Sequence, residues 1–116
     1  MERFEAILQA IMQSWQQLRP ELLREILAPD IVYYEDPHEP PLTSIDAVID
    51  RWEKDLKTHS GLQLDYKIVD IEGDNCIAQW SAQWNDSERG PRMSRGVYYL
   101  HLDQDEKLHE FRQWWM

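Results

Sequence analysis

Residues 76–84 read Cys-Ile-Ala-Gln-Trp-Ser-Ala-Gln-Trp, and every second position in this stretch is apolar. The residues that share this apolar face are Cys76, Ala78, Trp80, Ala82 and Trp84. Successive side chains of a strand point to opposite faces of a sheet, so a period of two predicts a half-buried β-strand. A sheet with one covered and one solvated face is typical of antiparallel strands.

Similar segments lie on both sides of this stretch. The sequence Glu72-Gly73-Asp74-Asn75 before it is typical of a hairpin turn. A polar loop at residues 85–92 and a turn at residues 103–106 separate the segments that follow it. Strands linked by hairpins predict one antiparallel sheet, with strands at residues 62–68, 76–84, 93–102 and 108–115.

The N-terminal residues favour helices instead. Apolar residues recur at steps of three and four over residues 3–18, which predicts a first helix. Pro20 suits the first turn of a second helix, and Ala28-Pro29 is expected to end it.

One more strand and one more helix complete the expected elements. Residues 31–34 are β-branched and aromatic, which predicts a short strand. The proline-rich residues 36–41 cannot continue it and are expected to form an irregular loop. Thr43 or Ser44 can cap a third helix, which ends near Gly61.

Helices that are separate from antiparallel strands define an α+β fold, and the length fits a single domain over residues 1–116. A curved antiparallel sheet packed against three N-terminal helices forms a cone. The open end of the cone is a natural place for an apolar pocket. We therefore expect a small apolar molecule as the ligand.

Charge and composition exclude several classes of partner. Twelve basic against 22 acidic residues give a net charge of −10, which argues against binding nucleic acid or anionic membranes. No apolar run approaches the roughly 18 residues of a membrane span, and the N-terminus lacks the layout of a signal peptide. Cys76 is the only cysteine and cannot form an internal disulfide, so the expected compartment is cytoplasmic.

No metal and no cofactor are predicted. The histidines lack the spacing of metal ligands, and the acidic turn at residues 103–106 lacks the glycine of a calcium loop. Cys76 falls in the apolar register of a strand and is expected to pack in the core. The four histidines are His38, His59, His101 and His109.

The element order, with the phrase Ala-Pro-Asp-Ile-Val-Tyr-Tyr-Glu-Asp-Pro at residues 28–37, resembles the nuclear transport factor 2-like superfamily. Within it, the chain is similar to the branch of SnoaL-like polyketide cyclases and ketosteroid isomerases. Trp52 in the helix after the proline-rich loop and the closing stretch at residues 102–115 fit that branch. The resemblance spans nearly the whole chain and implies an α+β barrel of the nuclear transport factor 2-like or cystatin-like kind.

The resemblance also implies a site. In ketosteroid isomerases the Asp of a Glu-Asp-Pro phrase is the general base beside a carbonyl, and that position is Asp36. A helix Tyr and a strand Asp stabilise the oxyanion there; these positions fall near Met12 or Trp15 and at Tyr98. The helix Tyr is therefore missing, and a phenol replaces the Asp. A phenol can still donate to an oxyanion, so Asp36 and Tyr98 are the expected catalytic residues.

The aromatic content is high, with six Trp and five Tyr. Core packing explains part of it, but the inner sheet face of this fold also lines its cavity, so several rings are expected to touch a ligand. His38 is either a second acid–base group or a solvated loop residue, and Asp36 before a proline also suits a turn. The expected pocket residues are Met12, Trp15, His38, Trp52, Trp80, Trp84, Phe111 and Trp115.

Large rings also fall on the outer sheet face, which favours a buried interface and hence a homodimer. The residues of this face are Tyr99, His101, Arg112 and Trp114. Two functions follow. The first is an isomerase- or cyclase-type enzyme without metal, which requires an inward-pointing Asp36. The second is a non-catalytic module that binds a ligand or a protein and dimerises through the outer face; an Asp36 held in a turn favours it.

Overall fold

Helix α1 (Glu2–Gln16) follows the apolar pattern of the N-terminal residues. The structure is a computed structural model that describes residues 2–115. The helix ends before the predicted Leu18, which takes a positive φ of 54°. The N–H groups of Leu18 and Arg19 donate to the carbonyls of Trp15 (3.1 Å) and Ser14 (2.8 Å), which closes the helix in a Schellman motif.

The second helical segment is a short 3-10 helix, η1 (Pro20–Glu25), with Pro20 at its start as expected. The predicted stop at Ala28-Pro29 is wrong, because strand β1 (Leu27–Tyr34) already includes both residues. β1 lies at the edge of the sheet, where a residue without an N–H is tolerated.

Helix α2 (Ile45–Leu56) begins at one of the two predicted caps. The Ser44 hydroxyl oxygen accepts a hydrogen bond from the N–H of Ala47 (3.1 Å), which satisfies a free donor of the first turn. The helix ends at Leu56 rather than near Gly61, because the next strand begins at His59. Its buried residues are Val48, Ile49, Trp52 and Leu56.

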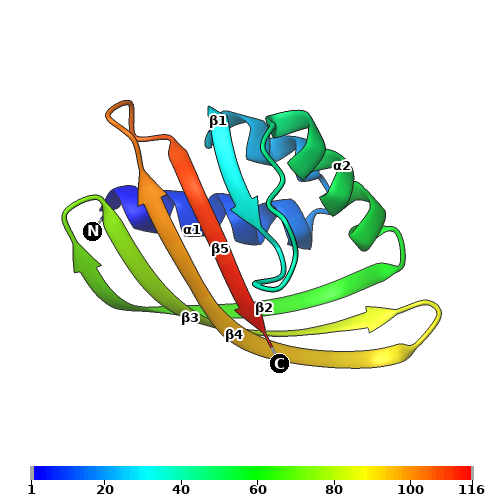
Figure 1. Ribbon diagram of the computed structural model, residues 1–116. Coiled ribbons are helices and arrows are strands. Elements are labelled where there is room, and N and C mark those ends of the chain that lie inside the picture. Colours follow the sequence, from blue (N-terminus) through cyan, green and yellow to red (C-terminus); the bar gives the residue numbers. More distant parts are fainter. Residues whose placement is uncertain (1, 116) are drawn as a thin grey trace.

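Five strands form one sheet in the order β1-β5-β4-β3-β2 (Figure 1). The four hairpin-linked strands expected from the sequence are confirmed as antiparallel neighbours. β1 pairs with β5 in parallel, a partner that the pattern of residues 31–34 does not specify. The bounds of the long strands are β2 (His59–Glu72), β3 (Asn75–Asp86), β4 (Gly90–Leu102) and β5 (Leu108–Trp115).

The connection between β3 and β4 is shorter than the predicted loop at residues 85–92. Only three residues separate Asp86 from Gly90. The Asp86 carboxylate accepts the N–H groups of Glu88 (2.8 Å) and Arg89 (3.1 Å), and Gly90 takes a φ of 80° that favours glycine. Local hydrogen bonds thus turn polar residues into a tight hairpin.

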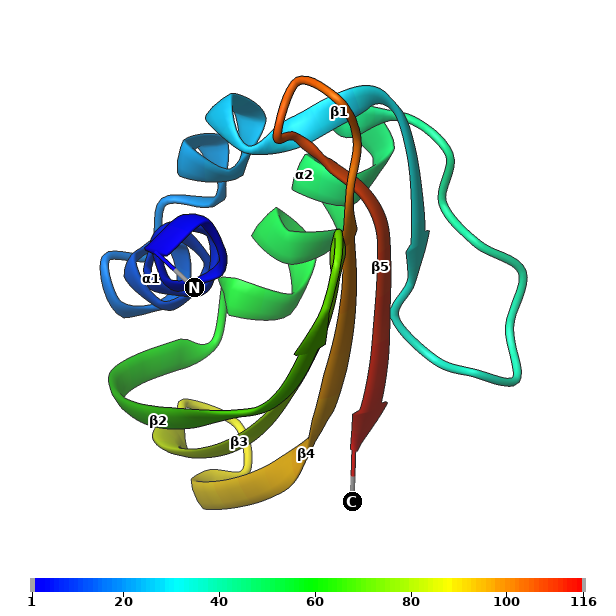
Figure 2. The same ribbon diagram turned by 90° about the vertical axis from the view of Figure 1, so that its left-hand side faces the viewer.

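The sheet curls around the helices, which cover one of its faces (Figure 2). Ala78, Trp80 and Leu100 on this inner face are buried, and their neighbours along the strands are more exposed. At Gly96 an added side chain would lie 1.8 Å from the Trp114 carbonyl oxygen, so a glycine is needed for β5 to approach β4. The predicted α+β architecture of a curved sheet against N-terminal helices is confirmed.

Candidate active site

The inner sheet face carries a continuous cluster of buried rings. Trp80 and Tyr98 stack with ring centroids 5.4 Å apart and an interplanar angle of 21°. Tyr98 meets the edge of Phe111 at 5.2 Å, and Phe111 lies 5.0 Å from Tyr33. Burial raises the pKa of Tyr98, so its hydroxyl keeps its proton and can act as a donor.

Tyr33 and Trp52 join β1 to α2 across the core. The Trp52 indole N–H donates to the Tyr33 hydroxyl oxygen over 3.2 Å. Burial, followed by the nearby charge of Glu35, raises the pKa of Tyr33 well above its ordinary value. Trp52 therefore lies in the core beside the site, with its polar atom already satisfied.

Glu35 is the next inward-facing residue after Tyr33, and it meets two charged residues of α2. Its side chain is only 20% exposed and forms an ion pair with Arg51. Its carboxyl also shares a hydrogen bond with Asp55. Burial, and then the Asp55 carboxyl, raise the pKa of Glu35 to about 8, and Arg51 offsets part of this shift. Such a carboxyl exchanges its proton near neutral pH.

The loop after β1 holds the residue expected as the base. One Asp36 carboxylate oxygen accepts the N–H of His38 (2.8 Å), which is ordinary turn chemistry. The loop stands away from the helices (Figure 2), and the His38 side chain is exposed. The structure thus does not bring His38 together with the ring cluster.

Half-buried aromatic residues gather where the last turn of α1 meets the ends of β2 and β3. Trp15 and Trp84 have ring centroids 5.2 Å apart, and His59 lies 5.1 Å from Trp84. The Trp15 indole N–H donates to His59 Nδ1 over 3.2 Å. Met12 is also half-buried and packs against the core. We call Trp15, His59 and Trp84 the rim cluster.

Trp115 contacts the backbone of Glu35. Its indole N–H donates to the Glu35 carbonyl oxygen over 3.1 Å, and its side chain is 53% exposed. The Gln113 side chain reaches the same carbonyl oxygen at 3.4 Å. The C-terminal strand thereby helps to hold the backbone of Glu35.

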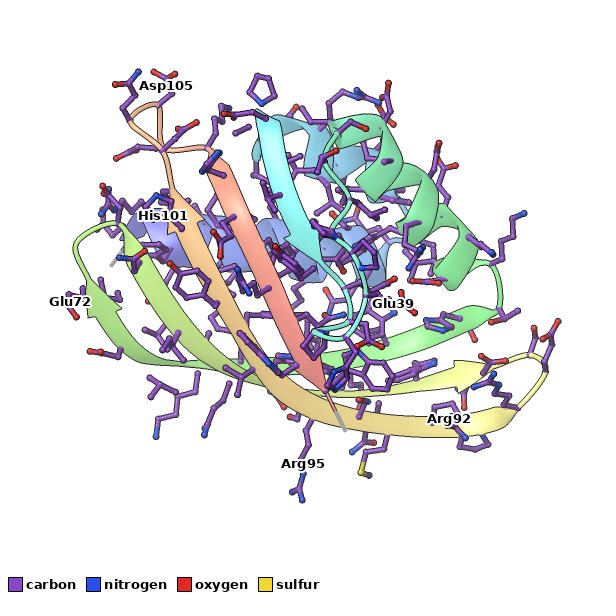
Figure 3. The ribbon with its side chains drawn as sticks, in the orientation of Figure 1. Glu39, Glu72, Arg92, Arg95, His101 and Asp105 are labelled. Atoms are coloured by element: carbon purple, nitrogen blue, oxygen red, sulfur yellow. The ribbon has the colours of Figure 1, made fainter. Side chains whose placement is uncertain are left out.

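Two shallow hollows, of about 510 and 200 Å³, lie on the outer face of the sheet. Their walls come from outward-facing side chains such as Lys67, Gln79 and Arg95, and Arg95 points away from the helices (Figure 3). Trp80 is the one predicted pocket residue that borders them. On the inner face the rings pack against one another, and the pocket expected between them stays a prediction.

The sequence reasoning missed Glu35, Arg51, Asp55 and His59. Glu35 follows Tyr33 by two residues, so the period of a strand places both on one face. Arg51 and Asp55 are four residues apart on the predicted third helix and border its apolar stripe, so one face of that helix carries both. These two spacings were the available signals; the contact between β1 and α2 is tertiary.

Within residues 2–115, no group of three His, Cys, Asp or Glu side chains is placed to hold a metal ion. No helix in the same range is long and apolar enough to cross a membrane.

A curved sheet around helices, with a ring-lined inner face and a half-buried carboxyl whose pKa is raised, places the chain among small α+β domains. The chain belongs to the SnoaL-like domain family, whose model matches residues 8–111. Its solved relatives include SnoaL-like polyketide cyclases and ketosteroid isomerases of the nuclear transport factor 2-like superfamily. No match was found among curated proteins.

Solved structures show the same fold at low sequence identity. The Δ5-3-ketosteroid isomerase from Mycobacterium sp. aligns with a TM-score of 0.76 at 15% identity, over 95% of this chain and 92% of that chain. A protein assigned to the polyketide cyclases, from Xanthomonas campestris pv. campestris, aligns with a TM-score of 0.80 at 13% identity, over 97% of this chain and 89% of that chain. A nuclear transport factor 2-like protein of unknown function from Exiguobacterium sp. 255-15 aligns with a TM-score of 0.77 at 14% identity, over 92% of this chain and 95% of that chain.

Proposed function

We propose that the chain is an isomerase- or cyclase-type enzyme that moves a proton on an apolar carbonyl compound, with Glu35 as the proton-transfer group. The observation that carries this proposal is the half-buried Glu35 carboxyl, whose pKa is raised to about 8. A general acid–base group works best when its pKa lies near the operating pH. Family membership and the ring-lined inner face support the choice of an apolar substrate.

The mechanism needs one proton and no oxidant. The ionised Glu35 takes a proton from the carbon next to the substrate carbonyl, and the electron pair of that C–H bond moves to the carbonyl oxygen. A donor such as the Tyr98 hydroxyl stabilises the resulting enolate. Where a C=C bond lies next to that carbon, the enolate is conjugated with it, and protonated Glu35 returns the proton to the far carbon of this bond, which completes an isomerisation. Arg51 and Asp55 set how easily Glu35 gains and loses this proton.

Asp36 is the rival for the same role, on the strength of the resemblance. One of its oxygens already accepts a backbone N–H within its own turn, which leaves the other available. Glu35 is favoured because its side chain is only 20% exposed, in contact with Arg51 of α2, and its pKa is already in the working range. The two assignments differ in which carboxyl is essential.

The test follows the exchange of α-hydrogens for deuterium in 2-acetylnaphthalene, an enolisable aromatic ketone, by NMR in deuterated buffer. The protein should accelerate this exchange over buffer alone. Glu35→Gln should lower the protein-dependent rate by about 10²-fold or more, the scale for losing a general base, and Asp36→Asn should lower it only a few-fold. Loss with Asp36→Asn and retention with Glu35→Gln would assign the base to Asp36. No acceleration by the wild-type protein would overturn the enzyme proposal.

A second candidate function is a non-catalytic module that pairs through its outer sheet face. The observation that favours it is the exposure of large apolar side chains there: Ile77 is 40% and Trp114 is 41% exposed. Tyr99 and Val97 extend the same patch across β4. Contiguous exposed apolar patches are rare on monomeric proteins, and those that occur often mark interaction sites.

A further inference from the structure

Two indole N–H groups on the inner sheet face have no hydrogen-bond acceptor among residues 2–115. They belong to Trp80 and Trp84, and both nitrogen atoms are fully shielded from solvent. Buried polar groups in native proteins nearly always have a partner, so each exception needs a physical explanation.

Other indoles of the chain show that the fold readily supplies acceptors. Trp15 donates to His59, Trp52 donates to Tyr33 and Trp115 donates to the Glu35 carbonyl oxygen. These three bonds hold elements of the fold together. Trp80 and Trp84 make no such bond, so their N–H groups do not serve the fold in this way.

The two indoles share one face of β3, with the small side chain of Ala82 between them. Trp80 is 6% exposed and stacks on Tyr98, whose hydroxyl is the proposed donor for the enolate. Trp84 lies in the rim cluster against Trp15 and His59. The His59 Nδ1 acceptor is already occupied by Trp15, so no free acceptor of the rim competes for Trp84.

We propose that the N–H groups of Trp80 and Trp84 are hydrogen-bond donors for the substrate, and that they select a ring-containing ketone over a hydrocarbon of the same shape. This inference rests on the proposed function and names its substrate class. Donors without neighbouring acceptors favour a ligand that carries a hydrogen-bond acceptor. The apolar rings around them favour an aromatic or alicyclic body, and the half-buried Met12 and Trp15 pack against the same core.

The experiment compares two ligands of nearly the same shape, 2-acetylnaphthalene and 2-isopropenylnaphthalene, in which C=CH2 replaces C=O. Protein labelled with 15N at the indole nitrogens gives separate signals, assigned with Trp80→Phe and Trp84→Phe. The ketone should bind about tenfold more tightly than the alkene, the scale of one net hydrogen bond. It should also move the Trp80 or Trp84 indole N–H signal downfield.

Trp80→Phe should reduce the preference for the ketone, and Trp84→Phe provides a second test if the first variant does not fold. Trp114→Phe on the outer face is the matched control and should keep the full preference. Equal affinities for ketone and alkene, unmoved Trp80 and Trp84 signals at saturation, or no binding at millimolar concentration would each overturn the inference. Glu35→Gln should bind the ketone like wild type, which separates this test from that of catalysis.

Discussion

At the scale of single residues, Glu35 is where burial and charge compete most directly. Burial and the Asp55 carboxyl favour its protonated form, and Arg51 favours its ionised form. The two neighbours come from the same helix, four residues apart, so the two effects can be separated by substitution. The surrounding structure sets this balance, because an exposed Glu would titrate near its ordinary pKa of about 4.3.

Substituting the two neighbours should move the pKa of Glu35 in opposite directions. Arg51→Gln removes the stabilising cation and should raise the pKa above the value of about 8, whereas Asp55→Asn should lower it. NMR titration of the Glu35 side-chain carboxyl carbon measures both shifts. Asp36→Asn is the control and should leave the titration of Glu35 nearly unchanged. A wild-type value close to that of an exposed Glu would contradict the geometry of the site.

At the scale of elements, one buried hydrogen bond joins α2 to β1. Tyr33→Phe removes the acceptor of the Trp52 indole N–H and leaves that donor buried without a partner. We expect a loss of about 1–3 kcal/mol in the free energy of unfolding, measured by urea denaturation. Tyr34→Phe, on the opposite face of β1, is the matched control and should cost much less. Equal losses in both variants would show that this bond contributes nothing specific.

The rim cluster joins α1 to the ends of β2 and β3 through His59. The Trp15 indole N–H requires an unprotonated Nδ1, so neutral His59 carries its proton on Nε2, which lies 3.9 Å from an Asp86 carboxylate oxygen. Burial lowers the pKa of His59, and the Asp86 charge offsets part of that shift. Protonation of His59 therefore breaks the bond to α1.

This arrangement predicts that the contribution of His59 to stability is lost in mild acid, whereas Glu35, whose pKa is raised by burial, acts in the opposite direction over the same range. Because the folded-state pKa of His59 is depressed, its contribution is complete above the unfolded value of about 6.5. It is lost as the pH falls through that value toward the lower folded-state pKa. Between pH 7.5 and 5, urea denaturation should show a less favourable change in the free energy of unfolding for wild type than for His59→Gln, because only wild type loses the His59 contribution. His38→Gln, in the exposed loop, should behave like wild type, and an unchanged slope in His59→Gln would disprove the link.

At the scale of the whole molecule, the helices cover one face of the sheet, and the other face carries an uncovered apolar patch over β3, β4 and β5 (Figure 2). The outer face exposes Ile77 and Trp114, and Arg112 lies over the Tyr34 ring at 4.2 Å beside its ion-pair partner Glu110. We propose that a second copy of the chain covers this face. The net charge of −10 opposes this association at long range, but Arg112 and Glu110 neutralise each other locally within the patch.

Sedimentation at micromolar concentration measures the assembly directly. The dimer should sediment at twice the chain mass of 14.0 kDa, and Trp114→Glu should shift it toward the monomer because a carboxylate is placed in the interface. Leu18→Glu, at the end of α1 and equally exposed to solvent, is the control and should leave the mass unchanged. A wild-type mass near 14.0 kDa that does not change on concentration would rule out the dimer.

The sequence by itself determined the elements whose pattern is local and strongly periodic. The alternation over residues 76–84 was enough to predict β3 and its buried face, and the turn at Gly73 predicted the hairpin before it. The Ser44 cap and the apolar stripe through Trp52 predicted α2. The predictions were wrong at the ends of elements, because local hydrogen bonds determine where an element stops. The hydrogen bonds at Leu18 end α1 early, and those of the Asp86 carboxylate shorten the loop expected at residues 85–92.

Only the tertiary structure decided which charged residues meet. Glu35 and Arg51 lie on different elements, and the burial that raises the Glu35 pKa exists only after α2 has packed over the end of β1. The parallel pairing of β1 with β5 was hidden for the same reason, since register between distant segments leaves no local pattern. The sequence predicted that Trp80 and Trp84 share one face of a strand, because that follows from the period of two. It could not predict that their indole N–H groups have no partner, because side-chain hydrogen bonds depend on neighbours in three dimensions.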